Sequence, residues 1–225
     1  MNDAIIKPLA LLGLGLLLGF KHALDADHIV AVSTIVSRTK SLKKSSIFGA
    51  LWGAGHTTTL FLSGLLILIL KISIPTKIAL FFEGFIGVVL VFMGLDVLKN
   101  LRQQDSHEHI HSHNSINHIH KHDQFGLHHH HKRSFIIGMI HGLAGSATLM
   151  LLVLATVKST IQGLLFILIF GIGSTVGMFL TSAVIGLPFV LTTKFKKINK
   201  IVKLLAGIIS ILLGITIVLE ILTLI

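Results

Sequence analysis

Long apolar runs separated by short polar connections dominate the chain. Six runs are about as long as the roughly 20 helical residues that cross a hydrocarbon core of about 30 Å. Their residues do not alternate between apolar and polar, as in a barrel strand, and backbone groups in lipid must bond within their own segment. The pattern predicts membrane-spanning helices at about 5–37, 46–70, 77–99, 134–157, 160–190 and 201–223.

The first run, 5–37, is longer than a bilayer requires, because about 33 residues at about 1.5 Å each make about 50 Å. This helix must therefore be tilted, broken or protruding. Residues 1–20 resemble a signal peptide in that Lys7 precedes an apolar stretch. No small-residue cleavage site follows and the chain continues into a polar cluster, so we interpret them as the start of the first membrane helix.

The composition is that of a membrane protein. Of the 225 residues, 52% are hydrophobic and 12% are charged, and the mean hydropathy is +0.88. A soluble domain of this size could not bury so much apolar surface. The chain has no cysteine, which excludes thiol–disulfide electron transfer and thiolate metal sites. Any metal ligands must be imidazole, carboxylate, hydroxyl or backbone oxygen.

The net charge of +10 indicates topology, because the basic residues are unevenly distributed. They gather at the connections after the first, third and fifth predicted helices, and such connections favour the cytoplasmic side. We therefore expect a cell-membrane protein with these connections in the cytoplasm, both termini outside and no nucleic-acid partner. The basic residues concerned are Arg38, Lys40, Lys43, Lys44, Lys99, Arg102, Lys121, Lys132, Arg133, Lys194, Lys196, Lys197, Lys200 and Lys203.

The two halves of the chain resemble each other at offsets of 119, 118 and 120 residues. Each half holds three predicted helices, an odd number, so the halves insert with opposite topology, as in many secondary transporters. The prediction is an all-α membrane protein with two inverted three-helix repeats, 1–100 and 134–225. The matching segments are 19–22 with 138–141, 53–57 with 171–175, and Gly87 and Gly94 with Gly207 and Gly214.

The segment that joins the halves, 101–133, is polar and rich in histidine. It has too few apolar residues to pack a core, so we expect disorder without metal. Histidines at every second position suit an extended chain that wraps an ion. We predict a cytoplasmic metal-binding loop and a cytoplasmic metallochaperone as a candidate partner. Its candidate ligands are His107, His109, His111, His113, His118, His120, His122, His128, His129, His130 and His131.

Four ionisable residues, His22, Asp25, Asp27 and His28, lie halfway along the first predicted helix. A charge at mid-bilayer costs about 2.5–3.5 kcal/mol on insertion scales, and a divalent cation would compensate the two aspartates. On an ideal helix Asp25 lies near both histidines, whereas Asp27 faces away. Either Asp27 acts elsewhere, or the helix unwinds here, which Gly19 and the excess length favour. The alternative is a helix junction with two capping aspartates and two interfacial histidines.

Further candidates lie in the other predicted helices. His56, in Gly-x-Gly-His-Thr, would complete an imidazole-rich site suited to nickel, cobalt, copper or zinc, or it bonds between helices. The second half has a histidine at the position of His22 but serines at those of Asp27 and His56, so metal-binding groups are concentrated in the first half. Glu83 could orient a metal ligand or accept a proton. The alternative is that its carboxylate reaches toward the outer membrane interface. The accessory candidates are Glu83, His141, Ser146 and Ser174.

The segment 21–29, Lys-His-Ala-Leu-Asp-Ala-Asp-His-Ile, resembles the signature of the nickel/cobalt transporter family, a histidine followed after four residues by Asp-His. Ala-Gly-His-Thr at 54–57 resembles the second signature of that family. The resemblance implies that three residues of the first segment are essential to transport and that two further residues support them. The essential residues are His22, Asp27 and His28, and the supporting ones are Asp25 and His56.

The chain also departs from the larger members of that family. Those members have arginine where Lys21 stands, eight membrane helices, and an acidic motif where this chain has 141–147. The six helices resemble the branch found with urease accessory genes, whereas the histidine-rich loop resembles the efflux branch.

We therefore expect a secondary transporter that carries Ni²⁺, and also Co²⁺, inward for metalloenzyme assembly. The alternatives are an efflux permease for the same ions and a membrane metal sensor or accessory protein that does not transport. No nucleotide-binding loop is present, so ATP is not the direct drive. The sequence has neither a His-Glu-x-x-His helix nor a paired nucleophile, the motifs that would indicate an enzyme. The expected partners are the metal ion and the lipid bilayer, and no catalytic cofactor is expected.

Overall fold

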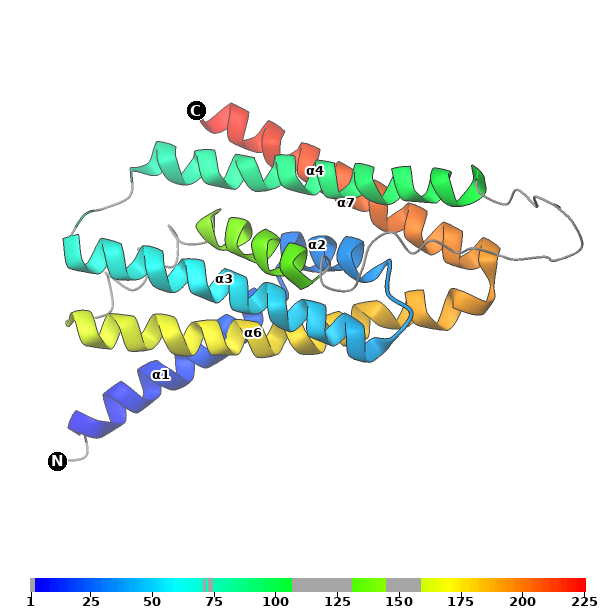
Figure 1. Cartoon of the computed structure of the whole chain (residues 1–225). Helices are drawn as coiled ribbons and strands as arrows, with labels where there is room; N and C mark the ends of the chain where they lie inside the picture. The colour runs from blue at the N-terminus through cyan, green and yellow to red at the C-terminus, as the bar shows by residue number, and fades with distance from the viewer. Residues whose placement is uncertain (1–2, 71, 73–74, 107–130, 145–158) are drawn as a thin grey trace, which may run out of the picture.

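The computed structural model describes residues 3–70, 72, 75–106, 131–144 and 159–225, and within them all regular structure is helical. A helical segment without a label in Figure 1 covers 131–144. Four of the described helices, α3, α4, α6 and α7, are long and apolar enough to cross a membrane. The labelled elements are α1 (Asp3–His22), α2 (Ala26–Val36), α3 (Leu42–Leu70), α4 (Thr76–Ser106), α6 (Thr160–Leu191), the 3-10 turn η1 (Thr192–Lys194) and α7 (Lys196–Leu224).

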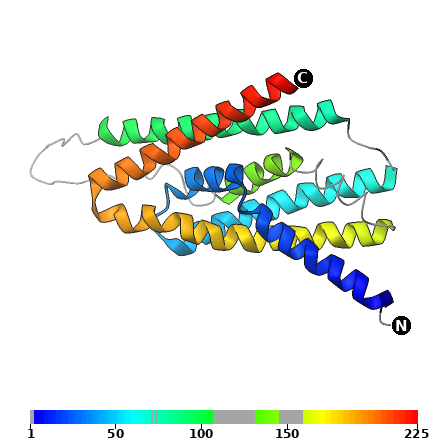
Figure 2. The same cartoon turned by 180° about the vertical axis from the view of Figure 1, so that it is seen from behind.

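The helices form three layers. The α3/α6 pair forms one outer layer, the α4/α7 pair forms the other, and both views place α2 and the 131–144 helix between them (Figures 1 and 2). The two helices of each outer pair run antiparallel. The start of α1 and the end of α7 lie toward one end of the molecule, whereas the 37–41 connection and the α6–α7 turn lie toward the other.

The long first helix is broken in two at residues 23–25. The amides of Leu24 and Asp25 bond to carbonyls only three residues back, which tightens the end of α1. Asp25 then takes an extended backbone conformation (φ −64°, ψ 148°) as the N-cap of α2, and its side chain makes no capping bond. The break therefore leaves the Asp25 carboxylate available for a partner other than the helix, and it turns the chain into α2, which lies in the middle layer (Figures 1 and 2).

The short helix α2 is the centre of the molecule. It contacts α3, α4, α6 and α7. Ala31, Val32 and Val36 are almost fully buried and belong to the larger apolar cluster, which also holds Trp52 and Leu90. Because eleven residues reach only about 16 Å, α2 does not cross a bilayer by itself.

Residues at equivalent positions of the two halves contact each other. Thr57 of α3 shares a hydrogen bond with Thr175 of α6 over 3.1 Å, at a separation of 118 residues. A Cβ atom added to Gly94 of α4 would lie 2.5 Å from the carbonyl of Gly207, and one added to Gly214 would lie 2.4 Å from that of Gly87. Such small residues allow membrane helices to approach closely, and the same close approach recurs at both ends of the α4–α7 crossing.

Helix α1 and the 131–144 helix pack in a similarly reciprocal way. A Cβ atom added to Gly19 of α1 would lie 1.9 Å from the carbonyl of Phe170. A Cβ atom added to Gly138 would lie 2.1 Å from the carbonyl of Trp52. Gly138 follows Gly19 by 119 residues and Phe170 follows Trp52 by 118, so one contact is the counterpart of the other. The offsets seen in the sequence thus recur in the packing.

The predicted helical membrane protein is confirmed at the level of its elements. The expected helices at 46–70, 77–99, 160–190 and 201–223 correspond to α3, α4, α6 and α7. The expected 5–37 helix is the broken α1–α2 pair. The expected 134–157 helix is observed up to 144, and its remainder, like most of 101–133, lies outside the described residues.

The close approach of α4 and α7 at glycines predicts different effects on stability for two glycine substitutions in α4. Gly94→Ala should destabilise the protein by about 1–3 kcal/mol, because the new methyl meets a backbone carbonyl and the core cannot yield without strain. Gly84→Ala should not destabilise it, because its methyl meets only the Ile221 side chain, at 3.3 Å or more. Thermal unfolding in one detergent compares the two. Equal midpoints for both variants would contradict the close crossing.

Candidate metal centre

Four helices bring five ionisable side chains together in the middle layer. His22 is the last residue of α1, Asp27 and His28 lie in the first turn of α2, His56 lies in α3, and His141 lies in the 131–144 helix. Two groups among the described residues could each hold a metal ion, with ligand atoms within 4.8 Å of one another. His28 belongs to both groups. The first group is His22, His28 and His56, and the second is Asp27, His28 and His141.

The Asp27 carboxylate lies between two imidazoles. Its Oδ1 accepts from Nδ1 of His28 at 3.0 Å, and its Oδ2 accepts from Nε2 of His141 at 2.7 Å. An ionised carboxylate only accepts, so each bonded nitrogen carries its proton. Nε2 of His28 is therefore left with a free lone pair. The histidines are 1% and 2% exposed, so Asp27 fixes both tautomers inside the protein.

Asp25 holds His22 in the same way. Its Oδ2 accepts from Nδ1 of His22 at 2.7 Å, which leaves Nε2 of His22 as the free nitrogen. Such carboxylate–histidine pairs orient metal ligands and raise their basicity. The Asp25 side chain is 49% exposed, compared with 30% for Asp27, so the Asp25–His22 pair is more accessible to solvent than the Asp27–His28 pair.

His56 completes the imidazole group. It is fully buried, and neither of its ring nitrogens has a hydrogen-bond partner among the described residues. Its ring centroid lies 5.2 Å from those of His22 and His28. A buried polar atom without a partner costs about 1–3 kcal/mol. The three histidines therefore present free nitrogens at one place, the donor set that suits nickel, cobalt, copper and zinc.

Aromatic rings form the wall of this centre. Trp52, one turn before His56 in α3, stacks on His28 with ring centroids 5.4 Å apart and meets His141 edge-on at 5.2 Å. Phe170 of α6 lies 5.4 Å from His22. The wall restricts the orientations of the imidazoles and keeps water from two sides of the group.

The remaining predicted site residues belong to neither metal-binding group among the described residues. Ser174, at the position equivalent to His56, is buried, and its hydroxyl has no partner among the described residues. Glu83 is exposed on α4 and belongs to neither metal-binding group. His131 begins the 131–144 helix and contacts the Phe48 ring at 5.4 Å. Ser146 and the histidines of 107–130 lie outside the described residues.

Comparison with known proteins identifies the family. Residues 28–216 match the family described as the cytochrome c biogenesis protein transmembrane region. The chain is 39% identical to the urease accessory protein UreH of Bacillus sp. (strain TB-90), over 92% of this chain and 90% of that protein. The chain belongs to the UreH family. The absence of cysteine in the printed sequence means that its membrane helices contain no thiol chemistry.

More distant relatives of this UreH-family protein occur in a plant. It is 26% identical to the chloroplast protein FOR GROWTH AND FERTILITY 1 of Arabidopsis thaliana, over 92% of this chain and 58% of that protein. It is 27% identical to FOR GROWTH AND FERTILITY 2, over 73% of this chain and 44% of that protein. No solved structure matches the chain significantly. The family match indicates a membrane protein.

Sequence reasoning underestimated two residues of the UreH-family centre. His141 was expected only as an accessory residue, but its bond to Asp27 joins the two halves of the chain. Trp52 was not singled out, although it is the chain's only tryptophan and stands four residues before His56, on the same helix face. That spacing was the available signal.

The Asp27 bonds give a prediction for the metal-free protein. Asp27→Ala should lower the free energy of unfolding by about 2–5 kcal/mol, because it leaves a buried nitrogen without a partner on each of two histidines. Asp25→Ala should cost less than about 1 kcal/mol, because exposed ion pairs contribute little. Denaturation in detergent with a chelator present measures both. A larger loss for Asp25→Ala would show that Asp27 is not the central acceptor.

Proposed function

We propose that this UreH-family protein is a secondary transporter of divalent transition-metal ions, with Ni²⁺ as the main substrate and Co²⁺ as a second. The observation that carries the proposal is the convergence of free nitrogens from His22, His28 and His56 at a break in the first helix. Imidazole donors favour these metals over magnesium and calcium. The urease accessory relative favours nickel, since nickel is the metal of urease.

We assign the first binding site for the ion to His22, His28 and His56. Asp25 orients His22 and Asp27 orients His28. The second group, Asp27, His28 and His141, is the neighbouring site, and it becomes available when the proton of each of these two imidazoles moves to the other nitrogen of the same ring, which frees the nitrogens that face Asp27. Because His28 belongs to both groups, the ion passes from one nitrogen of this ring to the other.

The two halves then act as inverted repeats of three helices each, 1–100 and 134–225, that rock about the centre. The antiparallel pairing of α3 with α6 and of α4 with α7 (Figure 1) supports this arrangement. The reciprocal contacts at offsets of 118 to 120 residues, such as Ser210 Oγ to the Leu90 carbonyl at 2.7 Å, support it as well.

We further propose that both termini lie outside and that the basic connections, including the histidine-rich loop, lie in the cytoplasm. Inward movement of a dication then exploits the negative interior, at about 2.3 kcal/mol per charge per 100 mV. The loop histidines, His107 to His131, receive the ion and pass it to a cytoplasmic metallochaperone. Net outward flux would instead indicate an efflux permease, and binding without flux would indicate a sensor.

Metal binding at the centre is measurable through Trp52. Because the chain's only tryptophan stacks on His28, Ni²⁺ should quench its fluorescence saturably, whereas Mg²⁺ should not. His28→Ala should abolish the quenching, and Asp25→Asn should weaken the affinity about 10–100-fold by loosening His22. Glu83→Gln, which removes a carboxylate outside both groups, is the matched control. Unchanged quenching in His28→Ala would remove the centre from the proposal.

Transport is tested by radioactive nickel flux in proteoliposomes, in both directions. His28→Ala should abolish flux at equal incorporation. Deletion of 107–130 should leave the maximal flux but raise the nickel concentration for half-maximal flux, because a tethered chelator raises the local ion concentration without changing translocation. Loss of flux at saturating nickel in the deleted protein would place the loop in the transport path.

A further inference from the structure

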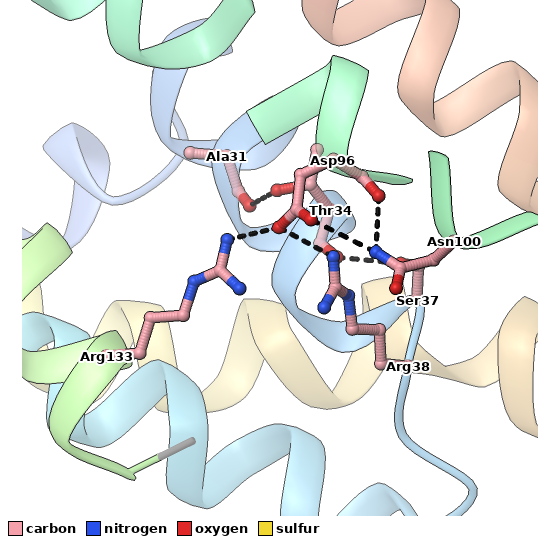
Figure 3. A network of polar contacts seen from close by, with 7 residues as sticks. All are labelled: Ala31, Thr34, Ser37, Arg38, Asp96, Asn100 and Arg133. Carbon is pink, nitrogen blue, oxygen red and sulfur yellow. Dashed lines mark hydrogen bonds and ion pairs between the residues drawn. The ribbon is translucent and has the colours of Figure 1, made fainter. Parts of the chain in front are cut away.

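A second polar site lies beside the metal centre, toward the end of the molecule where the basic connections gather. Asp96 of α4 lies between the guanidinium groups of Arg38 and Arg133 (Figure 3). Arg38 Nη2 is 2.7 Å from Asp96 Oδ2, and Asn100 donates to Oδ1 at 3.1 Å. Burial lowers the pKa of Arg38 and Asp96 opposes this shift, so the guanidinium remains charged.

A cavity of about 300 Å³ adjoins this network, and its lining is strongly basic. Arg38, Lys40, Lys44 and Arg133 line it against a single carboxylate, Asp96. Lys203 of α7 lies close enough to Lys40 and Arg38 to be repelled by both. One carboxylate cannot neutralise so many cations. Like charges repel each other more strongly in a cavity that excludes part of the water than in bulk water.

Two further features of the cavity favour an anion. Ser134, which is 1% exposed, lines the cavity, and its hydroxyl has no hydrogen-bond partner among the described residues. Lys44 lies in the first turn of α3, where free amides carry partial positive charge. Each arginine has five N–H donors, and Asp96 occupies only some of them. The cavity therefore offers both charge and hydrogen-bond donors.

The cavity shares its helices with the metal centre. Thr34 lies six residues after His28 on α2, and Ile137 lies four residues before His141. At about 1.5 Å per residue these positions are about 6–9 Å apart along each helix. An anion in the cavity would thus reduce the positive potential directly beside a site for a dication.

We propose that this cavity binds a phosphate group, either from free inorganic phosphate or from the headgroup of an anionic lipid. A tetrahedral polyanion accepts several charge-assisted bonds at once, which matches two arginines, two lysines and a hydroxyl. The volume exceeds what a single small ion needs. Basic pockets between membrane helices bind lipid headgroups by the same chemistry. The inference concerns binding alone and does not depend on metal transport.

The experiment uses the full chain in nanodiscs with a chelator present, and its two arms separate the two sources. In phosphatidylcholine discs, equilibrium binding of radiolabelled inorganic phosphate should saturate if the ligand is free phosphate. In discs that also contain phosphatidylglycerol, native mass spectrometry should show this lipid retained on the protein if the ligand is a headgroup. Binding in neither arm overturns the proposal.

Two opposite substitutions distinguish this site from general surface charge. The double variant Lys40→Gln/Lys44→Gln should weaken binding about tenfold or more, because it removes two cations from the cavity wall. Asp96→Asn should tighten binding several-fold, because it removes the competing carboxylate and releases both arginines. The control is Lys43→Gln, an exposed neighbour that does not line the cavity. Equal weakening by Lys43→Gln, or unchanged binding in the double variant, overturns the proposal.

Both lysines of the double variant are exposed, so the fold should survive their replacement. Equal thermal midpoints for all variants except Asp96→Asn verify this. If Asp96→Asn does not fold, the comparison between the double variant and Lys43→Gln still decides the question.

Discussion

The bond between Asp27 and His141 joins the two halves of the molecule at its centre. Asp27 comes from the broken first helix and is 30% exposed, whereas His141 comes from the 131–144 helix and is almost fully buried. A carboxylate that is partly removed from water needs hydrogen bonds, and Asp27 uses both oxygens, the other on His28. The tautomers of two histidines, and with them the direction of the free nitrogens, follow from this one group.

Small residues place that carboxylate. Helices in a membrane gain little from apolar burial, so they associate through close packing and bonds between them. Here the crossings of α1 with α6 and of α4 with α7 bring backbone against backbone at glycines, and Thr57 binds the Gly171 carbonyl at 2.9 Å. Helix α2 is held between these pairs, which explains how a helix of eleven residues is stable inside the protein.

The amino-acid pattern was sufficient to predict the long helices, because apolar length alone defines a span. It also predicted that His22 and His28 come together, since the aspartates around them needed compensation. The excess length of the first run and Gly19 favoured a broken helix, and the structure confirms the break at 23–25. The pattern did not show that the Asp25 side chain bonds to His22 and makes no capping bond. The approach of His141 to Asp27 depends on packing between distant segments, which spacing along one helix does not encode. The place of Trp52, four residues before His56 on one helix face, is by contrast visible in the sequence.

The sharing of His28 between the two metal-binding groups has a consequence for stoichiometry. Two dications, each bound within about 2 Å of a nitrogen of the same ring, would repel each other by far more than thermal energy even at an effective dielectric constant of about 20. Occupation of one group would therefore weaken binding at the other. A centre of this kind would fill with one ion first, and a second ion would bind it with much lower affinity.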